Sequence, residues 1–191
     1  FGLMIIFLAV ATSYGQVIDV NGIIFNEVYY DATTNSGGQW NGIGTADADL
    51  EYFELYNSGA SSVNIANWVI ADGNSFWFKF NSTSRIINVG ESFIITKELG
   101  NYIPPTNHYS YDVDVEGSLS GTFGGGNSGD CLFLINTGTD AAVGGNDDTW
   151  ITFRYNSVAE ATSLGSSGGT PSGTNNGTEV TGADVIDQSL V

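Results

Sequence analysis

Basic residues are scarce in this sequence of 191 residues, which has 4 Lys plus Arg against 21 Asp plus Glu and a formal net charge of −17. The basic residues are Lys79, Arg85, Lys97 and Arg154. Binding to nucleic-acid phosphates, or to anionic lipid headgroups, requires clustered positive charge that these four cannot supply. The composition therefore excludes direct nucleic-acid binding and docking on anionic membranes.

Cysteine and histidine each occur once, as Cys131 and His108. A single cysteine forms no internal disulfide, and the apolar run at residues 131–135 predicts that Cys131 is a small buried side chain. Nucleophilic catalysis by Ser or Cys needs a histidine beside the nucleophile, and zinc needs several such ligands. We interpret His108 as a surface loop histidine, expect no zinc site and assign no catalytic residue.

Charge is absent from residues 1–15, and residues 1–11 form an apolar run. The run is shorter than the roughly 20 residues that span a bilayer. Ser13 and Gly15 are small residues at −3 and −1 from a cut before Gln16, as in secretory signal peptides. We expect a signal-peptide remnant shortened at its start, and an exported protein whose mature chain does not insert into the membrane. The alternative is a buried strand or helix at the start of the domain.

Sustained helical periods are missing after the leader, and short β-branched and aromatic runs alternate with Gly, Asn, Ser and Asp clusters. Strands are expected at residues 17–30, 51–56, 63–70, 75–80, 85–87, 92–96, 109–115, 131–135 and 149–155. About nine short strands with frequent turns predict an all-β antiparallel sandwich or barrel.

Two turns and one alternating segment sharpen this prediction. Asn21 and Gly22 divide the first segment, and Asp72 and Gly73 suit a hairpin turn. In residues 76–80, alternation predicts that Phe76, Phe78 and Phe80 face the core while Trp77 and Lys79 face outward.

The chain divides by composition into four parts. After the leader, residues 16–158 carry the strand pattern, and residues 159–180 are rich in Gly, Ser, Thr and Asn, as in a flexible linker. Residues 181–191 are interpreted as a tail that docks back or as the start of a further domain. We expect the chain to be a piece of a longer polypeptide, fused to other domains.

Carboxylates are the main candidate functional groups, and two sets of three occupy every second position along extended segments. The groups are Asp47, Asp49 and Glu51, and Asp112, Asp114 and Glu116. Alternation points each group to one side, and Ca²⁺ prefers such oxygen ligands. Both are candidate Ca²⁺ sites, and no other cofactor is expected. The alternative is a solvated acidic strand face, or an edge protected from pairing by its charge.

Tryptophans are the candidates for stacking on sugar rings. They are Trp40, Trp77 and Trp150, of which Trp40 lies in the long polar loop at residues 31–49. The alternative for each is anchoring of the core or of a loop, which is the more usual role of tryptophan.

Five segments in order carry a family resemblance. They are residues 23–31 with Asn26 and Glu27, 50–57 with Glu51, Glu54, Leu55 and Asn57, 63–70 with Trp68, 89–95 with Gly90, and 118–135. In this order and spacing they resemble the lamin tail domain, in its bacterial secreted form, over roughly residues 20–155. Trp68 lies in an apolar run, which predicts that it fills the space between two sheets.

The resemblance implies an immunoglobulin-like antiparallel β-sandwich with Greek-key connections. It also implies a non-catalytic binding or spacer module of a secreted or cell-surface protein, with protein or carbohydrate as partner. The DNA binding of animal lamin tails does not transfer, because the basic surface is absent. The alternatives are part of a secreted metal-dependent hydrolase that uses clustered carboxylates, such as a phosphoesterase or nuclease, and a purely structural repeat of a surface protein.

Overall fold

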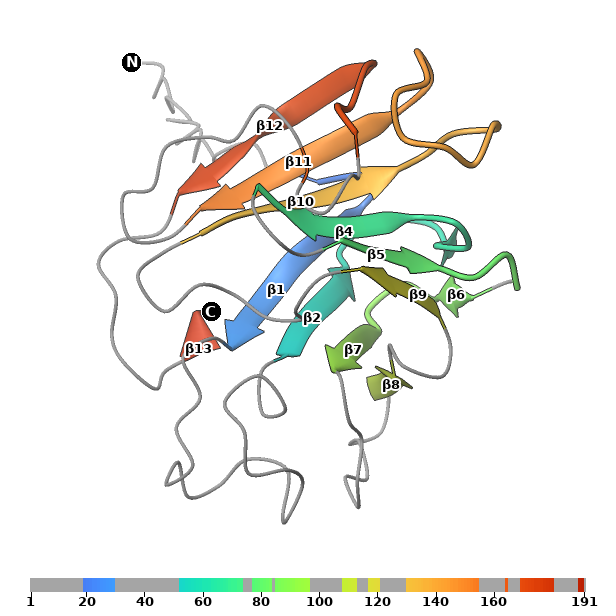
Figure 1. Ribbon diagram of the computed structural model, residues 1–191. Helices are drawn as coiled ribbons and strands as arrows, with labels where there is room; N and C mark the ends of the chain where they lie inside the picture. The colour runs from blue at the N-terminus through green and yellow to red at the C-terminus, as the bar shows by residue number, and fades with distance from the viewer. Residues whose placement is uncertain are drawn as a thin grey trace, which may run out of the picture.

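Every regular element in the described residues is a β-strand (Figure 1). The computed structural model of the chain describes residues 19–29, 52–73, 77–83, 85–96, 108–112, 117–120, 130–154, 164, 169–180 and 189–190. The strands are β1 (Ile23–Tyr29), β2 (Tyr52–Asn57), β3 (Val63–Asn64), β4 (Val69–Asp72), β5 (Trp77–Phe80), β6 (Ile86–Ile87), β7 (Ser92–Thr96), β8 (His108–Asp112), β9 (Gly117–Ser120), β10 (Cys131–Asn136), β11 (Thr149–Arg154), β12 (Thr174–Val180) and β13 (Ser189–Leu190). Within these ranges, no helix has the length and apolar character that a membrane crossing requires.

The strands form two large sheets that lie one over the other (Figure 1). One has five strands in the order β13-β1-β2-β7-β8, and the other has six in the order β12-β11-β10-β4-β5-β9, while β3 and β6 form a separate pair. Neighbouring strands are antiparallel except β7–β8 and β11–β12, which are parallel. The predicted all-β sandwich is confirmed, and each large sheet has a parallel pair at one edge.

The main core lies between the two large sheets and follows the alternation of their strands. Phe53 of β2 and Phe78 and Phe80 of β5 are fully buried there, and Trp68 joins the same cluster with 3% of its surface exposed. Side chains of alternate residues share one face of a strand, so each strand contributes every second residue. The inward positions predicted for Phe78, Phe80 and Trp68 are confirmed, whereas Phe76 lies outside the described residues.

Aromatic contacts join the two sheets across this core. The rings of Phe25 on β1 and Phe153 on β11 have centroids 5.8 Å apart, and those of Phe80 on β5 and Phe93 on β7 have centroids 6.3 Å apart. Both distances lie in the range that favours tilted or edge-on ring pairs. The sheets are therefore held together by ring packing near both ends of their strand order.

Strand β10 is buried on both faces, which explains its unbroken apolar sequence. Leu132 and Leu134 face the main core, while Cys131, Phe133 and Ile135 belong to a second cluster on the opposite face of the sheet. Cys131 is 1% exposed. The prediction of a small buried cysteine side chain is confirmed.

Both predicted turns lie where their strands require them. Val20 and Ile23 exchange two backbone hydrogen bonds of 2.9 Å around Asn21 and Gly22. Strands β4 and β5 pair as the expected antiparallel hairpin, although residues 74–76 of its turn are outside the described residues. His108 differs from its prediction, because it begins β8 and its backbone pairs with Ser92 instead of lying in a loop.

The C-terminal part of the chain also differs from the linker expectation. Thr174–Val180, within the predicted linker at 159–180, form β12 beside β11. Composition predicted no strand there, because its side chains at 174–176 are polar and exposed and its order comes from backbone pairing. Ser189–Leu190 form β13, which pairs with β1. The predicted leader at residues 1–15 lies outside the described residues.

Candidate functional site

The carboxylate of Glu54 ties together three strands of the five-stranded sheet. Its Oε1 accepts a hydrogen bond of 2.5 Å from Asn26 Nδ2 on β1 and one of 3.1 Å from Ser92 Oγ on β7. A β-bulge between Phe25 and Glu27 places Asn26 and Glu27 together opposite this part of β2. Glu54 is 5% exposed, so its carboxylate is a buried structural group. The motif residues Asn26, Glu27 and Glu54 thus fix the register of β1 on β2.

Asn57, at the end of β2, connects three backbone segments through its side-chain amide. Its Nδ2 donates to the carbonyls of Ser61 at 2.9 Å and Ile87 at 2.8 Å, and its Oδ1 accepts from the Gly59 N–H at 3.0 Å. The side chain is fully buried, and both amide hydrogens have acceptors. Its own carbonyl accepts from the N–H of Gly90, whose φ of 78° is easily adopted only by glycine.

The remaining motif residues that the structure describes are part of the core. Leu55 is fully buried and Trp68 nearly so, both within the main cluster. Each described motif residue has a structural role, because it packs in the core, stabilises a turn or sets the strand register. Glu51 lies outside the described residues.

The two acidic groups predicted as Ca²⁺ sites lie largely outside the described residues. This holds for Asp47, Asp49, Glu51, Asp114 and Glu116. Asp112 ends β8, and only its backbone is described. Trp40, a predicted stacking residue, is also outside the described residues. These predictions remain open.

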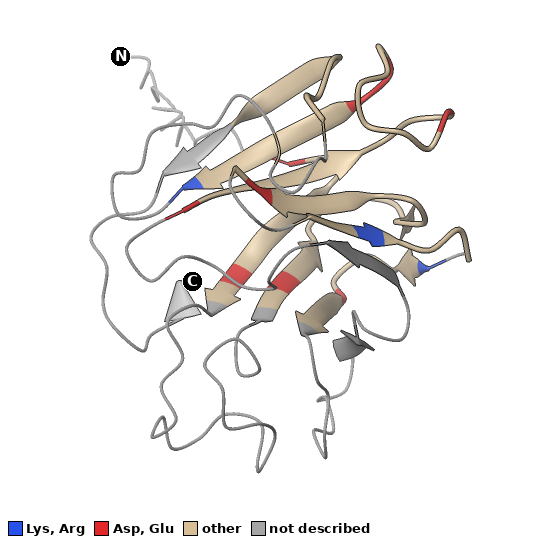
Figure 2. Cartoon of the chain, in the orientation of Figure 1, with Lys and Arg blue, Asp and Glu red and all other residues tan. Residues whose placement is uncertain are grey.

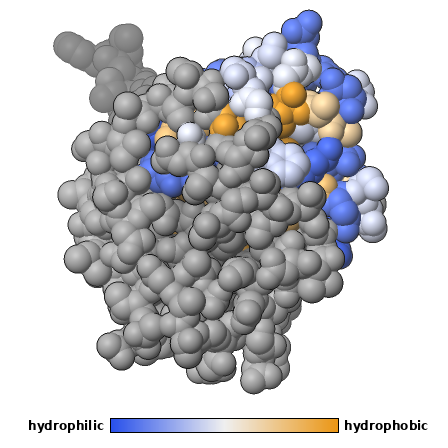
Figure 3. All heavy atoms as spheres, in the orientation of Figure 1, coloured by the Kyte–Doolittle hydropathy of each residue, from blue (hydrophilic) through white to orange (hydrophobic). Residues whose placement is uncertain are grey.

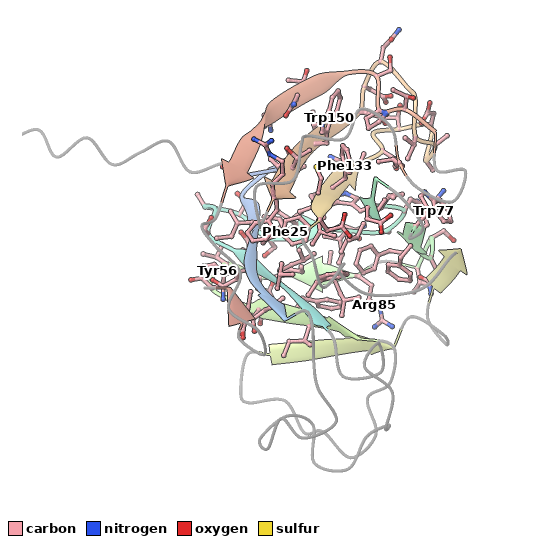
Figure 4. The ribbon with its side chains drawn as sticks, turned by 60° about the vertical axis from the view of Figure 1, so that its left-hand side comes forward. Phe25, Tyr56, Trp77, Arg85, Phe133 and Trp150 are labelled. Carbon is pink, nitrogen blue, oxygen red and sulfur yellow. The ribbon has the colours of Figure 1, made fainter. Side chains whose placement is uncertain are left out.

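Trp77 and Trp150 border an apolar cluster on the outer face of the six-stranded sheet, which we call the outer cluster. Its buried members are Val69, Ala71, Cys131, Phe133, Ile135 and Leu164. Trp77, Trp150 and Val143 are partly buried and pack against it. Figure 4 shows Trp150 and Phe133 on neighbouring strands and Trp77 further along the same sheet. In Figure 3, hydrophobic side chains stand among hydrophilic ones in the upper part of the visible surface. Trp77 points away from the main core, as predicted, and both tryptophans are partly exposed, although the ring nitrogen of Trp77 is buried.

A third acidic group, which sequence analysis missed, lies in the loop from residue 137 to 148 between β10 and β11. One carboxylate oxygen from each of Asp140, Asp147 and Asp148 lies within 4.8 Å of the others. Figure 2 shows acidic residues on the loops at this end of the sheet. Asp140 and Asp147 are seven residues apart in this loop and meet because the loop folds back through Ala141, whose φ is 57°, and Gly144, whose φ is 105°. The sequence signal was Asn146-Asp147-Asp148 directly before a strand, with an aspartate earlier in the same turn.

The three carboxylates have different environments. Asp147 is exposed, and its Oδ2 accepts hydrogen bonds from the N–H of Thr139 at 2.7 Å and from its hydroxyl at 2.8 Å. These two bonds, the backbone one first, hold the pKa of Asp147 below its ordinary value. Asp140 is exposed, whereas Asp148 is fully buried, with Oδ2 accepting from the Gly144 N–H at 2.7 Å. Asp148 Oδ1 is buried without a hydrogen-bond partner.

Comparison with known families agrees with this architecture. The sequence model of the Lamin Tail Domain family matches residues 16–163. A search of curated proteins found no match. The matched range contains strands β1 to β11 and the motif residues that organise them. Since the match spans more than half of the chain and the family has the immunoglobulin-like fold seen here, the chain belongs to the Lamin Tail Domain family.

Proposed function

We propose that this chain is a non-catalytic binding module of a secreted or cell-surface protein, of the bacterial secreted type. The family and the sandwich fold fit a non-catalytic module. The observation that carries the proposal is the role of Glu54, because the most prominent motif acid is buried and hydrogen-bonded by Asn26 and Ser92. A general acid or base needs access to substrate, which this carboxylate does not have.

The alternative of a metal-dependent hydrolase needs carboxylates from several strands converging on a cleft. Among the described residues, the group of three acids that could share a metal ion is Asp140, Asp147 and Asp148, and all three belong to one turn between adjacent strands. A metal ion bound in one turn would order that loop, whereas catalysis would need carboxylates from several strands. We therefore propose that the chain is not an enzyme and that Ca²⁺ orders its loops.

For the ligand, we propose a neutral carbohydrate at the cell exterior. Trp77 and Trp150 are partly exposed residues beside the outer cluster, and aromatic rings provide apolar faces for stacking on sugars. The net charge of −17 disfavours polyanionic ligands and leaves uncharged glycans acceptable. A protein ligand is the other outcome of the test below.

The test combines binding with a search for turnover. The purified chain is incubated with insoluble neutral polysaccharides, and bound and free fractions are measured for the wild type, Trp77→Ala and Trp150→Ala. Each substitution should weaken binding by about two- to tenfold, the usual worth of one aromatic contact. Val89→Ala is the matched control, because Val89 is a large exposed apolar residue in the turn before β7.

Four results would contradict the proposal in different parts. Equal binding by all variants would mean that Trp77 and Trp150 do not contact the ligand. Capture of a protein instead of any glycan would mean that the ligand is a protein. Hydrolysis of a phosphoester, peptide or glycoside that is abolished by one carboxylate substitution would overturn the non-catalytic assignment. Absence of binding to any of the polysaccharides or to any protein would favour the purely structural repeat.

A further inference from the structure

The loop between β10 and β11 holds a group of carboxylates with no assigned role. We propose that Asp140, Asp147 and Asp148 bind one divalent cation of the calcium type. This inference rests on the calcium part of the proposed function, which it deepens by naming the site, and it is independent of the ligand-binding part.

The separation of the three carboxylates suits a single ion. One oxygen from each lies within 4.8 Å of the others. Calcium binds carboxylate oxygens at 2.3–2.6 Å, so two ligands on opposite sides of one ion are about 5 Å apart. The three oxygens therefore need little rearrangement to share a cation.

Asp148 supplies the second, independent observation. Its side chain is fully buried, and its Oδ1 has no hydrogen-bond partner. A buried carboxylate oxygen without a partner is disfavoured, so native structures pair such groups with donors or metal ions. The other oxygen of this carboxylate already accepts from the Gly144 N–H. A cation that Asp148 binds through Oδ1 would satisfy the oxygen that the protein leaves unpaired.

The absence of a side chain at Gly145 leaves room for carboxylate oxygens of Asp140 and Asp147. A Cβ atom built on Gly145 would lie 2.7 Å from Asp140 Oδ2 and 2.7 Å from Asp147 Oδ1. A Cβ on Gly138 would lie 2.3 Å from Asp147 Oδ2. Both positions thus tolerate no side chain while the carboxylates converge, as expected for a loop shaped around its acidic ligands.

A basic side chain also contacts this loop, but it is directed to the backbone. Lys79 Nζ donates a hydrogen bond to the carbonyl of Ala141. Three carboxylates that approach this closely repel one another, and a single surface ammonium on a neighbouring carbonyl only partly offsets that repulsion. A bound divalent ion compensates the charge directly.

The ligand chemistry favours calcium over zinc or magnesium. The group consists only of carboxylate oxygens, whereas zinc sites use His and Cys. Calcium accepts six to eight oxygens in flexible arrangements, and the two exposed carboxylates leave room for water ligands. Magnesium demands near-ideal octahedral geometry, which a turn with three unequal acids does not offer.

Binding of a cation at this site would also affect the start of β12, because the backbone of Asp148 contacts it. The Asp148 carbonyl accepts from the Thr174 N–H at 2.8 Å, and a Cβ on Gly173 would lie 2.1 Å from the same carbonyl oxygen. Ser172 Oγ donates to Asn146 Oδ1 at 3.4 Å. The ion would therefore fix the loop against which the parallel strand β12 begins.

The test uses the whole chain, first treated with chelator and then titrated with CaCl₂ at fixed ionic strength. Melting temperature and calorimetric heat are recorded for each variant. At a calcium concentration about 100 times Kd, the wild type should melt on the order of 5–10 °C higher than the chelated chain. The triple variant Asp140→Asn, Asp147→Asn, Asp148→Asn should lose this shift.

Two charge-matched triples serve as controls, because each removes the same number of carboxylates from a sequence-predicted group. They are Asp47→Asn, Asp49→Asn, Glu51→Gln, and Asp112→Asn, Asp114→Asn, Glu116→Gln. Both should keep the calcium shift. If one of them loses it while the loop triple keeps it, calcium binds elsewhere and this assignment is wrong, although the calcium part of the proposed function survives.

Gly145→Ala tests the site without changing any charge. It remains informative if the triple variant fails to fold. Its methyl group takes the space between Asp140 and Asp147, whose side chains are able to swing away. We expect at least about tenfold weaker calcium binding with an unchanged melting temperature in chelator. Unchanged calcium affinity in Gly145→Ala and in Asp140→Asn, or no calcium shift in the wild type, overturns the proposal.

Discussion

Replacing Asn57 by alanine should be among the most damaging polar substitutions in the chain. The change removes the donor to the Ser61 and Ile87 carbonyls and the acceptor for the Gly59 N–H. A buried group left without its partner costs about 1–3 kcal/mol, and the bond to Ile87 is the fully buried one. Water can reach the part-buried partners, so we expect a total loss of about 3 kcal/mol in the free energy of unfolding.

This loss is a large share of the roughly 5–15 kcal/mol that stabilises a domain. Urea unfolding, followed by tryptophan fluorescence, measures it as a lower midpoint with an unchanged m-value. Asn88→Ala is the control, because its side-chain bonds to Ser62 and Glu91 are exposed, and it should cost no more than about 0.5 kcal/mol. Asn57→Asp should be worse than alanine, since it turns a carboxylate oxygen toward two carbonyls. A cost for Asn57→Ala below about 1 kcal/mol, or equal to that of Asn88→Ala, would refute this account of the turn.

Three further predictions concern the core, the acidic loop and β12. Trp68→Ala should lower the free energy of unfolding by about 3–5 kcal/mol, measured in urea, because it empties the space between the sheets; a cost under 1 kcal/mol would mean that the ring is not a core element. In Thr139→Val, the carboxyl pKa of Asp147 followed by NMR should rise toward, without reaching, its ordinary value, because the backbone N–H bond remains. Since its folded pKa is depressed, the stability that Asp147 contributes is present above its unfolded pKa and is lost as pH falls through the folded value. Gly173→Ala should speed hydrogen exchange across β12, because the new methyl overlaps the Asp148 backbone; unchanged exchange there would contradict the observed approach.

The strands and the main core were largely predictable from the sequence. In Trp77–Phe80 the inward residues alternate with outward ones, so period-two patterning identified Phe78 and Phe80. Trp68 was also identified, because a large aromatic residue in an apolar run has few alternatives to the core. These features depend on residues close in sequence, which is where pattern reasoning is strongest.

The features that were missed depend on backbone pairing and on loop conformation. Strand β12 has no apolar period, since its described side chains are polar and its order comes from parallel pairing with β11. The carboxylate group in the β10–β11 loop needs Ala141 and Gly144 at positive φ to bring Asp140 back to Asp147. Neither backbone pairing nor a loop reversal is visible in local composition.

The parallel pairing of β12 with β11 bears on where this domain ends. The family match stops at residue 163, before β12 begins at Thr174, yet β12 belongs to the same six-stranded sheet. A fragment cut at the family boundary would uncover the backbone N–H and C=O groups of β11 along that edge, next to the buried side chains of Ile151 and Phe153. Uncovered edges of this kind recruit strands from other copies and favour aggregation. The structural domain is therefore longer than the range that the family model matches, and β12 covers the apolar edge of the sheet with a strand whose described side chains are polar.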